Sequence, residues 1–146
     1  MKTHETIRHH VEIRFRDVDA MGHVNNAVFF TYFEEGRKVF LEKVLGIVHA
    51  SQYPFIMARI ECDYRAPLLL GNRPVLEIWI GEIGTRKFTF RYRLRDPDSD
   101  DLIYAAGESV MVFYDYTSGR SVPLSPDVSQ RIRPFVEETD RGGDVS

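Results

Sequence analysis

The sequence of 146 residues has a single cysteine, no long apolar run and no excess of basic residues. Cys62 cannot form a disulfide within the chain, so nothing in the sequence requires an oxidising compartment. No apolar run approaches the ~20 residues that a membrane-spanning helix needs. The first residues, "MKTHETIRHHVEIR", are too polar for a signal peptide. We therefore expect a cytoplasmic protein without a membrane segment.

The charge balance excludes a further class of protein. The chain has 19 Lys and Arg residues and 22 Asp and Glu residues, which give a formal net charge of −3. A general nucleic-acid binder needs a basic surplus to hold phosphates, so we expect no nucleic-acid partner. The hydrophobic content of 43% is ordinary for a globular protein, and the length suits one domain over residues 1–146 with a real core.

One long helix is predicted over residues 26–45, where the hydrophobic period changes from two residues to between three and four. Either Asn25 or Asn26 can cap its start, and Gly46 can end it. Its apolar stripe consists of Phe29, Tyr32, Phe33, Gly36, Val39 and Phe40.

Strict alternation of apolar and polar residues predicts strands on both sides of this helix. Before the helix, residues 9–15 alternate, with Val11, Ile13 and Phe15 on one side. After it, strands are predicted over residues 56–64, 75–83, 86–95 and 102–116. In the first of these, Ile56, Ala58, Ile60, Cys62 and Tyr64 share a side, and in the third Phe88, Phe90, Tyr92 and Leu94 do.

The end of the chain is predicted to form a short helix over residues 126–137 and a frayed tail over residues 139–146. The order of elements is then strand, one long helix, and about four strands joined by short turns. Such strands form an antiparallel sheet, and a curved sheet can enclose one helix with an aromatic stripe. We expect self-association to cover the remaining sheet edge.

The chemistry-bearing residues gather directly before the helix. Within ten residues the chain places Asp17, Asp19, Gly22, His23, Asn25 and Asn26. Backbone N–H groups at a helix N-terminus can stabilise a carbonyl oxygen that gains negative charge. Asp19, in a loop with Gly22, could attack that carbonyl or deprotonate a water. A thioester suits this arrangement, because a thiol pKa of about 8.5 makes thiolate a good leaving group.

Other interpretations of the same residues stay open. Asp and Asn are the usual capping and turn residues, so the cluster could serve only to start the helix. His23 could orient Asp19 or the substrate, or could be a polar turn residue. A calcium loop is excluded, because its fifth and twelfth positions would be Met21 and Val28. Asp19 with His23 lacks further ligands for a transition metal, and Cys62 alternates with apolar residues as a buried structural thiol does.

The segment "FRDVDAMGHVNNAVFFTYFEEGR" resembles the signature of the 4-hydroxybenzoyl-CoA thioesterase-like branch of the hotdog-fold superfamily. The likeness continues through "CDYRAPLLLGNRPVLEIWIGEIGTRKFTFRYRL" and "AAGESVMVFYDYTSGRSVPLSP". It implies an α+β hotdog fold in which a curved antiparallel sheet of about five strands wraps a long central helix. It also implies a homodimer or dimer of dimers with interface active sites. The implied reaction is hydrolysis of acyl-CoA or acyl-carrier-protein thioesters without a metal or other cofactor.

The resemblance places the catalytic acid on Asp19, which precedes the Ala-Met-Gly-His-Val run, and the carbonyl-polarising N–H at or near Asn26. His23 becomes an auxiliary catalytic residue, and Gly22 is expected to face the substrate. Plant acyl-carrier-protein thioesterases have Asn two residues after the acid, where this chain has Met21.

Basic residues at the start of the strand predicted over residues 86–95 could bind the phosphates of CoA. We expect Arg86 and Lys87 to contact them, whereas Arg91 and Arg93 suit a solvated strand face. The alternative function is a non-catalytic acyl-CoA-binding hotdog module in which Asp19 only caps the helix. A hotdog dehydratase is disfavoured, because its usual His and acid on separate elements are not evident.

Overall fold

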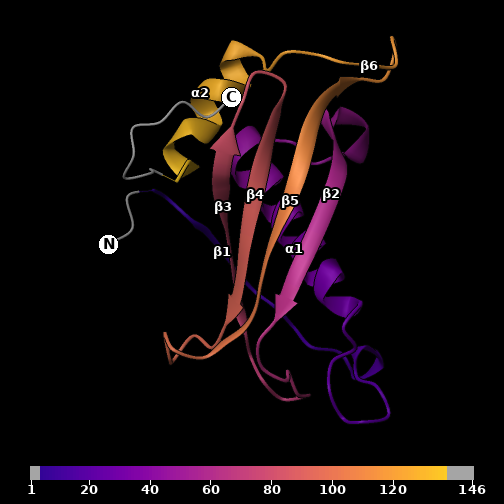
Figure 1. Cartoon of the computed structure of the whole chain (residues 1–146), viewed down its shortest axis with the longest axis vertical. Coiled ribbons are helices and arrows are strands. Elements are labelled where there is room, and N and C mark those ends of the chain that lie inside the picture. The colour runs from indigo at the N-terminus through magenta and orange to yellow at the C-terminus, as the bar shows by residue number, and fades with distance from the viewer. Residues whose placement is uncertain (1–3, 138–146) are drawn as a thin grey trace.

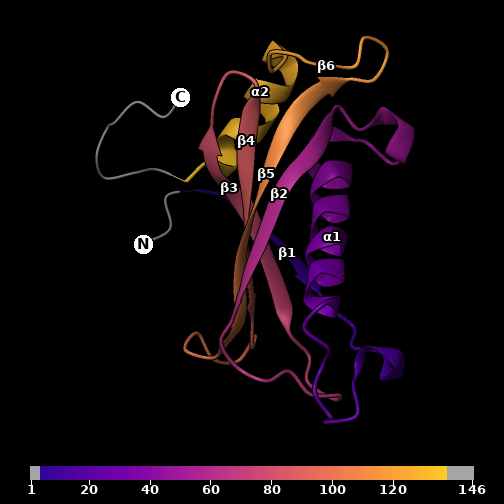
Figure 2. The same ribbon diagram turned by 45° about the vertical axis from the view of Figure 1, so that its right-hand side comes forward.

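In the computed structural model, one long helix lies against one face of an antiparallel sheet (Figures 1 and 2). The structure describes residues 4–137. Helix α1 spans Val28–Phe40, and a π-helical turn, Leu41–Leu45, continues it. The strands are β1 (Ile7–His10), β2 (Phe55–Tyr64), β3 (Val75–Ile83), β4 (Lys87–Arg95), β5 (Ile103–Asp115) and β6 (Arg120–Ser121). Helix α2 spans Pro126–Ile132. No helix within residues 4–137 is long and apolar enough to cross a membrane.

The strand order is β1-β3-β4-β5-β2, with the short β6 paired to β5. Strand β2 therefore does not pair with β3, which follows it in sequence, but lies on the far side of β5. Every pairing among these strands is antiparallel. This order leaves β2 at one edge of the sheet, next to α1 (Figure 2). It also carries the C-terminal end of β2 to the N-terminal end of α1.

The predicted aromatic stripe of α1 forms the core. Its buried residues are Phe29, Tyr32, Phe33, Gly36 and Phe40. Phe33 stacks on Tyr92 of β4, with ring centroids 4.4 Å apart. A Cβ atom on Gly36 would collide with the side chain of Leu76 in β3, so this position requires glycine for close packing. As predicted, Gly46 ends the helix in the left-handed conformation, with φ of 67°.

The strand predicted over residues 9–15 is wrong beyond His10. Strand β1 ends there because its partner β3 begins only at Val75, and the last contact is the Val11 N–H donated to Pro74 O at 3.0 Å. The chain then turns, and Phe15 enters a 3-10 turn with 83% of its surface exposed. The alternation of residues 9–15 could not show that the neighbouring strand, β3, does not extend beside residues 11–15.

Strand β2 changes face where the sequence predicted unbroken alternation. Met57 pairs with Met111, but Arg59 pairs with Val110, so Ala58 is an extra residue in a β-bulge. The bulge moves Ile56 and Ala58 out of phase with Ile60.

Other predicted elements hold. Phe88, Phe90, Tyr92 and Leu94 of β4 are all buried, as the alternation required. The predicted helix over residues 126–137 is α2 followed by a 3-10 turn, Arg133–Phe135. The tail predicted over residues 139–146 lies outside the described residues.

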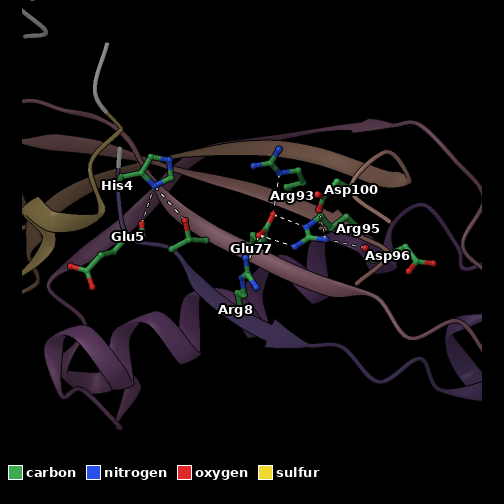
Figure 3. Close-up of polar contacts among 9 residues, drawn as sticks. His4, Glu5, Arg8, Glu77, Arg93, Arg95, Asp96 and Asp100 are labelled. Atoms are coloured by element: carbon green, nitrogen blue, oxygen red, sulfur yellow. Dashed lines mark hydrogen bonds and ion pairs between the residues drawn. The ribbon is translucent and has the colours of Figure 1, made fainter. Parts of the chain in front are cut away.

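The outer face of the sheet carries a buried carboxylate among arginines (Figure 3). Glu77 of β3 is completely buried, and guanidinium nitrogens of Arg8, Arg93 and Arg95 lie 3.5, 3.2 and 3.0 Å from its oxygens. Arg93 also covers the ring of Trp79 at 5.2 Å. Of the two arginines predicted to lie on a solvated strand face, Arg93 thus pairs with Glu77, and Arg91 pairs with Glu108 and Glu137 instead.

A second buried carboxylate, Asp17, ties the strand–helix junction to α1. Its Oδ2 atom accepts the Arg14 N–H at 2.9 Å and the Tyr32 hydroxyl at 2.8 Å. Its Oδ1 atom lies 3.6 Å from the Arg14 guanidinium, and its backbone oxygen accepts the Asn25 N–H at 2.9 Å. Burial, together with the Asp17 carboxylate, raises the pKa of Tyr32, so the phenol stays a donor. Asp17 thus connects the chain before the hairpin, at Arg14, with the chain after it, at Asn25, and with Tyr32 of α1.

We predict that Asp17→Asn lowers the free energy of unfolding by about 2 kcal/mol, because hydrogen bonds to a buried charged group are strong. An amide nitrogen in place of one oxygen would face a donor. Urea unfolding checks this, with Asp98→Asn as the matched control on an exposed aspartate. Equal stability of the two variants would contradict an anchoring role for Asp17.

Candidate active site

Asp19 lies in a tight hairpin just before α1. Asp19 N–H donates to His23 O at 2.8 Å, and Gly22 N–H donates to Asp19 O at 3.0 Å. A bridge between Val18 and Val24 closes the hairpin. Gly22 has a φ of 85°, a conformation that favours glycine, so this residue shapes the turn. The hairpin presents Asp19 at the surface.

The carboxylate of Asp19 uses only one of its oxygens within the turn. Oδ1 accepts the N–H of Met21 at 2.9 Å and the N–H of His23 at 3.4 Å. Oδ2 has no hydrogen-bond partner among residues 4–137, and the residue is exposed. One oxygen of this carboxylate is therefore open to a substrate or to water.

His23 meets Asp19 through its backbone and not through its ring. In the part of the chain that the structure describes, the His23 ring makes no hydrogen bond. The ring is exposed, and the residue lines a cavity at the start of α1. An orienting contact between imidazole and carboxylate, one of the two roles expected for His23, is thus not formed in this structure.

The first turn of α1 leaves one backbone donor without an acceptor. Val28 N–H donates to Asn25 O at 2.9 Å, and Ala27 N–H donates to the side-chain oxygen of Asn25 at 2.9 Å. The N-cap is Ala27, so neither predicted asparagine occupies that position, and the Asn25 side chain instead closes the turn directly before it. Nothing among residues 4–137 accepts the N–H of Asn26. This donor sits at the positive end of the helix dipole.

A cavity of about 290 Å³ adjoins this donor. It lies between the junction and the segment that follows β2, and a bridge between His23 and Leu69 joins the two. Its lining residues are His23, Val24, Asn26, Phe29, Tyr64, Arg65, Ala66, Pro67 and Leu68. The structure thus brings two of the predicted residues, His23 and Asn26, to one cavity. Asp19 lies in the same hairpin but is not among the lining residues.

Sequence reasoning missed Tyr64 and Arg65 as members of this site. Tyr64 donates its hydroxyl to Asn26 O at 2.8 Å, and its ring meets Phe29 edge-on at 5.0 Å. Their only signal in the sequence is an aromatic residue and a cation directly before the turn "APLLLGN". That signal becomes informative only when β2 is known to pair with β5.

Arg86 and Lys87 do not join the site within one chain. They lie where the β3–β4 hairpin meets β4, at the end of the sheet opposite the start of α1 (Figures 1 and 2). Both are exposed, and Arg86 donates from Nη1 to Ser121 O at 2.8 Å. A ligand bound at Asn26 could meet them only on a second chain.

A larger cavity, of about 560 Å³, lies between the second half of α1 and the first half of β2. Its apolar lining includes Leu41, Tyr53, Phe55, Ile56, Met57 and Met111.

Cys62 lies farther along β2, and burial raises the pKa of its thiol to about 11. A thiol with that pKa is protonated at neutral pH, so Cys62 is no nucleophile.

Chemically, the junction combines the N–H of Asn26, a residue that lines the cavity, with a carboxylate oxygen of Asp19 in the preceding hairpin. The donor can polarise a carbonyl, and the carboxylate can accept a proton or attack the carbonyl carbon. Among residues 4–137, no three His, Cys, Asp or Glu side chains are placed to hold a metal ion. A backbone donor and a carboxylate in one junction are groups that can serve acyl transfer.

Comparison with known proteins gives a consistent picture. The model of the Thioesterase-like superfamily matches residues 13–132. A chloroplast acyl-acyl carrier protein thioesterase of Arabidopsis thaliana is 27% identical over an alignment of 139 positions, which covers 90% of this chain and 71% of that protein. A thioesterase of Thermus thermophilus, solved with coenzyme A and Zn, is 32% identical with a TM-score of 0.76, covering 86% of this chain and 96% of that chain.

A further solved structure, described as a predicted thioesterase from Bacillus stearothermophilus, has a TM-score of 0.83 at 23% identity, covering 90% of this chain and 97% of that chain. Likeness at this identity shows the fold alone, and it confirms the predicted hotdog architecture. The finer resemblance to the 4-hydroxybenzoyl-CoA thioesterase-like branch stays a prediction. The matched residues include the hairpin, α1 and the cavity beside Asn26. The chain belongs to the Thioesterase-like superfamily.

Proposed function

We propose that the protein hydrolyses an acyl-CoA or acyl-carrier-protein thioester to a free acid and a thiol. The observation that carries this proposal is that one junction holds an N–H on Asn26 and a carboxylate oxygen on Asp19 that make no hydrogen bond within residues 4–137. Preorganised donors at a helix N-terminus stabilise the negative charge that develops on a carbonyl oxygen. The names of two relatives, one acting on an acyl carrier protein and one solved with coenzyme A, support the substrate class.

In the proposed reaction, the thioester carbonyl oxygen accepts the Asn26 N–H. Asp19 either removes a proton from a water whose oxygen attacks the carbonyl carbon, or attacks that carbon itself to form an anhydride that water then cleaves. In both routes the C–S bond breaks, and the thiolate leaves and takes up a proton. His23 acts as an auxiliary polar group, and Gly22 lets the hairpin face the substrate. No cofactor enters either route.

The turn itself favours one competing function. Because Oδ1 of Asp19 accepts two backbone N–H groups, the residue also stabilises the hairpin. A protein in which that is its whole role would be a non-catalytic acyl-CoA-binding module. Such a module would bind acyl-CoA and release no thiol.

A second copy of the chain is part of the proposal. No strand within residues 4–137 covers the outer edge of β2. The backbone N–H and C=O groups along such an edge can pair with a strand of another chain. A two-fold pairing of β2 with its symmetry mate would set the start of α1 in one chain against the 560 Å³ cavity of the other. It would also turn the partner's β3–β4 hairpin, which carries Arg86 and Lys87, toward this end of the sheet.

We predict a homodimer or dimer of dimers at micromolar concentration. Met57→Glu, on β2 with 43% of its surface exposed, should shift the protein toward monomer and lower turnover together. Light scattering measures the mass, and Leu102→Glu, which changes an exposed apolar residue in the loop before β5, is the matched control. A monomeric wild type with full activity would refute an interface site.

We predict that replacing Arg86 and Lys87 together by Ala raises KM for acyl-CoA and leaves kcat largely intact, because binding common to ground and transition states is lost. Steady-state kinetics measure both constants. Unchanged kinetics would return both residues to an ordinary surface role.

A mixing experiment then tests from which chain these cations come. If Arg86 and Lys87 serve the site of the partner, mixing this double variant with Asp19→Asn restores one intact site per mixed dimer and turnover at low KM. No restoration in dimers shown to have exchanged subunits would mean that the cations do not act across the interface.

We predict that Asp19→Asn lowers kcat by ~10²–10⁴ with acyl-CoA binding retained, because the base or nucleophile is lost. The Asn oxygen can still accept the N–H groups of Met21 and His23, so the hairpin should survive. His23→Ala should have an intermediate effect. Free-thiol release measures turnover, and the melting temperature reports on the fold.

Asp63→Asn, on an exposed aspartate of β2, is the matched control and should keep full turnover. If Asp19→Asn lowers the melting temperature and leaves turnover intact, the residue is a turn cap and the enzymatic role of the junction is wrong. Wild-type protein that binds acyl-CoA without releasing thiol would establish the binding module instead.

A further inference from the structure

We propose that Tyr64 is a positioning residue for the reaction, which it serves by holding Asn26, a lining residue of the 290 Å³ cavity just before α1, so that its N–H keeps one orientation. This inference rests on the proposed function and adds to it a residue from a distant element. Tyr64 is the last residue of β2 and lies 38 positions from Asn26 in sequence. The contact between them is made only through the fold.

The backbone of Tyr64 is itself held firmly. Tyr64 pairs with Ala105 of β5, and the next two N–H groups, from Arg65 and Ala66, both donate to Tyr104 O at 2.9 and 3.2 Å. The phenol therefore projects from a fixed end of the sheet. Its edge-on contact with the buried Phe29 fixes the ring from the side of the core.

The hydroxyl of Tyr64 acts at the start of α1, where the backbone hydrogen bonds are long. Asn26 O is reached within α1 only by the Phe29 N–H at 3.3 Å, and Phe30 N–H reaches Ala27 O at the same distance. The Tyr64 hydroxyl gives Asn26 O a shorter bond of 2.8 Å. Without it, the residue that carries the proposed donor would be free to tilt.

Tyr64 keeps this bond across the pH range in which thioester hydrolysis would be measured. Burial and the neighbouring Cys62 raise the pKa of the Tyr64 phenol, so it stays protonated and continues to donate. Tyr64 is 42% exposed and lines the cavity, so a substrate bound there would contact it as well. A donor contributes fully to transition-state stabilisation only if it is aimed before the reaction begins.

The test is Tyr64→Phe, which removes the hydroxyl and keeps the ring on Phe29. We expect kcat to fall about tenfold, as a modest misplacement of a catalytic group does. KM should change little, and the melting temperature should stay near that of the wild type. Tyr64→Leu, which also removes the ring from the cavity wall, should raise KM in addition. Tyr114→Phe, on β5 at the end of the sheet away from the start of α1, is the control for loss of a phenol and should keep wild-type kinetics.

A lower kcat with unchanged KM and melting temperature indicates a positioning role. A merely structural role would instead lower the melting temperature and the fraction of active protein together. Wild-type kcat in Tyr64→Phe, with kcat still lost in Asp19→Asn, overturns the role of Tyr64 and leaves the proposed function standing. If wild-type protein releases no thiol, the proposed function fails. In that case, NMR can compare the hydrogen-exchange rate of the Asn26 amide between the wild type and Tyr64→Phe. An unchanged rate would refute the role of the Tyr64 hydroxyl in holding Asn26.

Discussion

The close approach of α1 to the sheet is the constraint on which the rest of the molecule depends. Gly36 allows it, because any side chain there would meet Leu76, and Gly107 of β5 does the same for the ring of Phe33. The stacking of Phe33 on Tyr92 then fixes the rotation of the helix about its axis. With position and rotation set, the first turn of α1 must emerge at one end of the sheet. The junction and the segment after β2 are brought together there and joined through Val24 N–H and Leu68 O at 2.7 Å.

This placement divides the two aspartates of the junction by their surroundings. A buried carboxylate is tolerated only where its oxygens are satisfied, and both oxygens of Asp17 are taken by Arg14 and Tyr32. Asp17 is also buried, so a substrate does not reach its carboxylate. Asp19, two residues later and on the surface, keeps one oxygen open. The structural anchor and the proposed catalytic group thus need different burial, and the change from the 3-10 turn that ends at Asp17 to the hairpin that holds Asp19 provides it.

Elements whose evidence is local could be predicted from the sequence, whereas features that depend on topology could not. The stripe of α1, the stop at Gly46 and the buried side of β4 each follow from a few neighbouring residues. The end of β1 depends on where β3 begins, and the phase of β2 depends on one bulge at Ala58. The same limit applies to the candidate site: residues of the junction were found, but Tyr64 was not, because it arrives through the pairing of β2 with β5.

The exposure of the junction in one chain bears on how the proposed chemistry could be efficient. A carboxylate and a helix dipole act weakly in water, since the solvent screens both, and strongly where water is excluded. In a single chain Asp19 is exposed and Asn26 is reached from an open cavity. In the proposed dimer, the partner would supply the covering surface. The uncovered edge of β2 adjoins the apolar 560 Å³ cavity, so the pairing that would satisfy the edge would also enclose the junction of the partner. Assembly and catalysis would then depend on the same strand, which explains why a charged residue on β2 should disturb both.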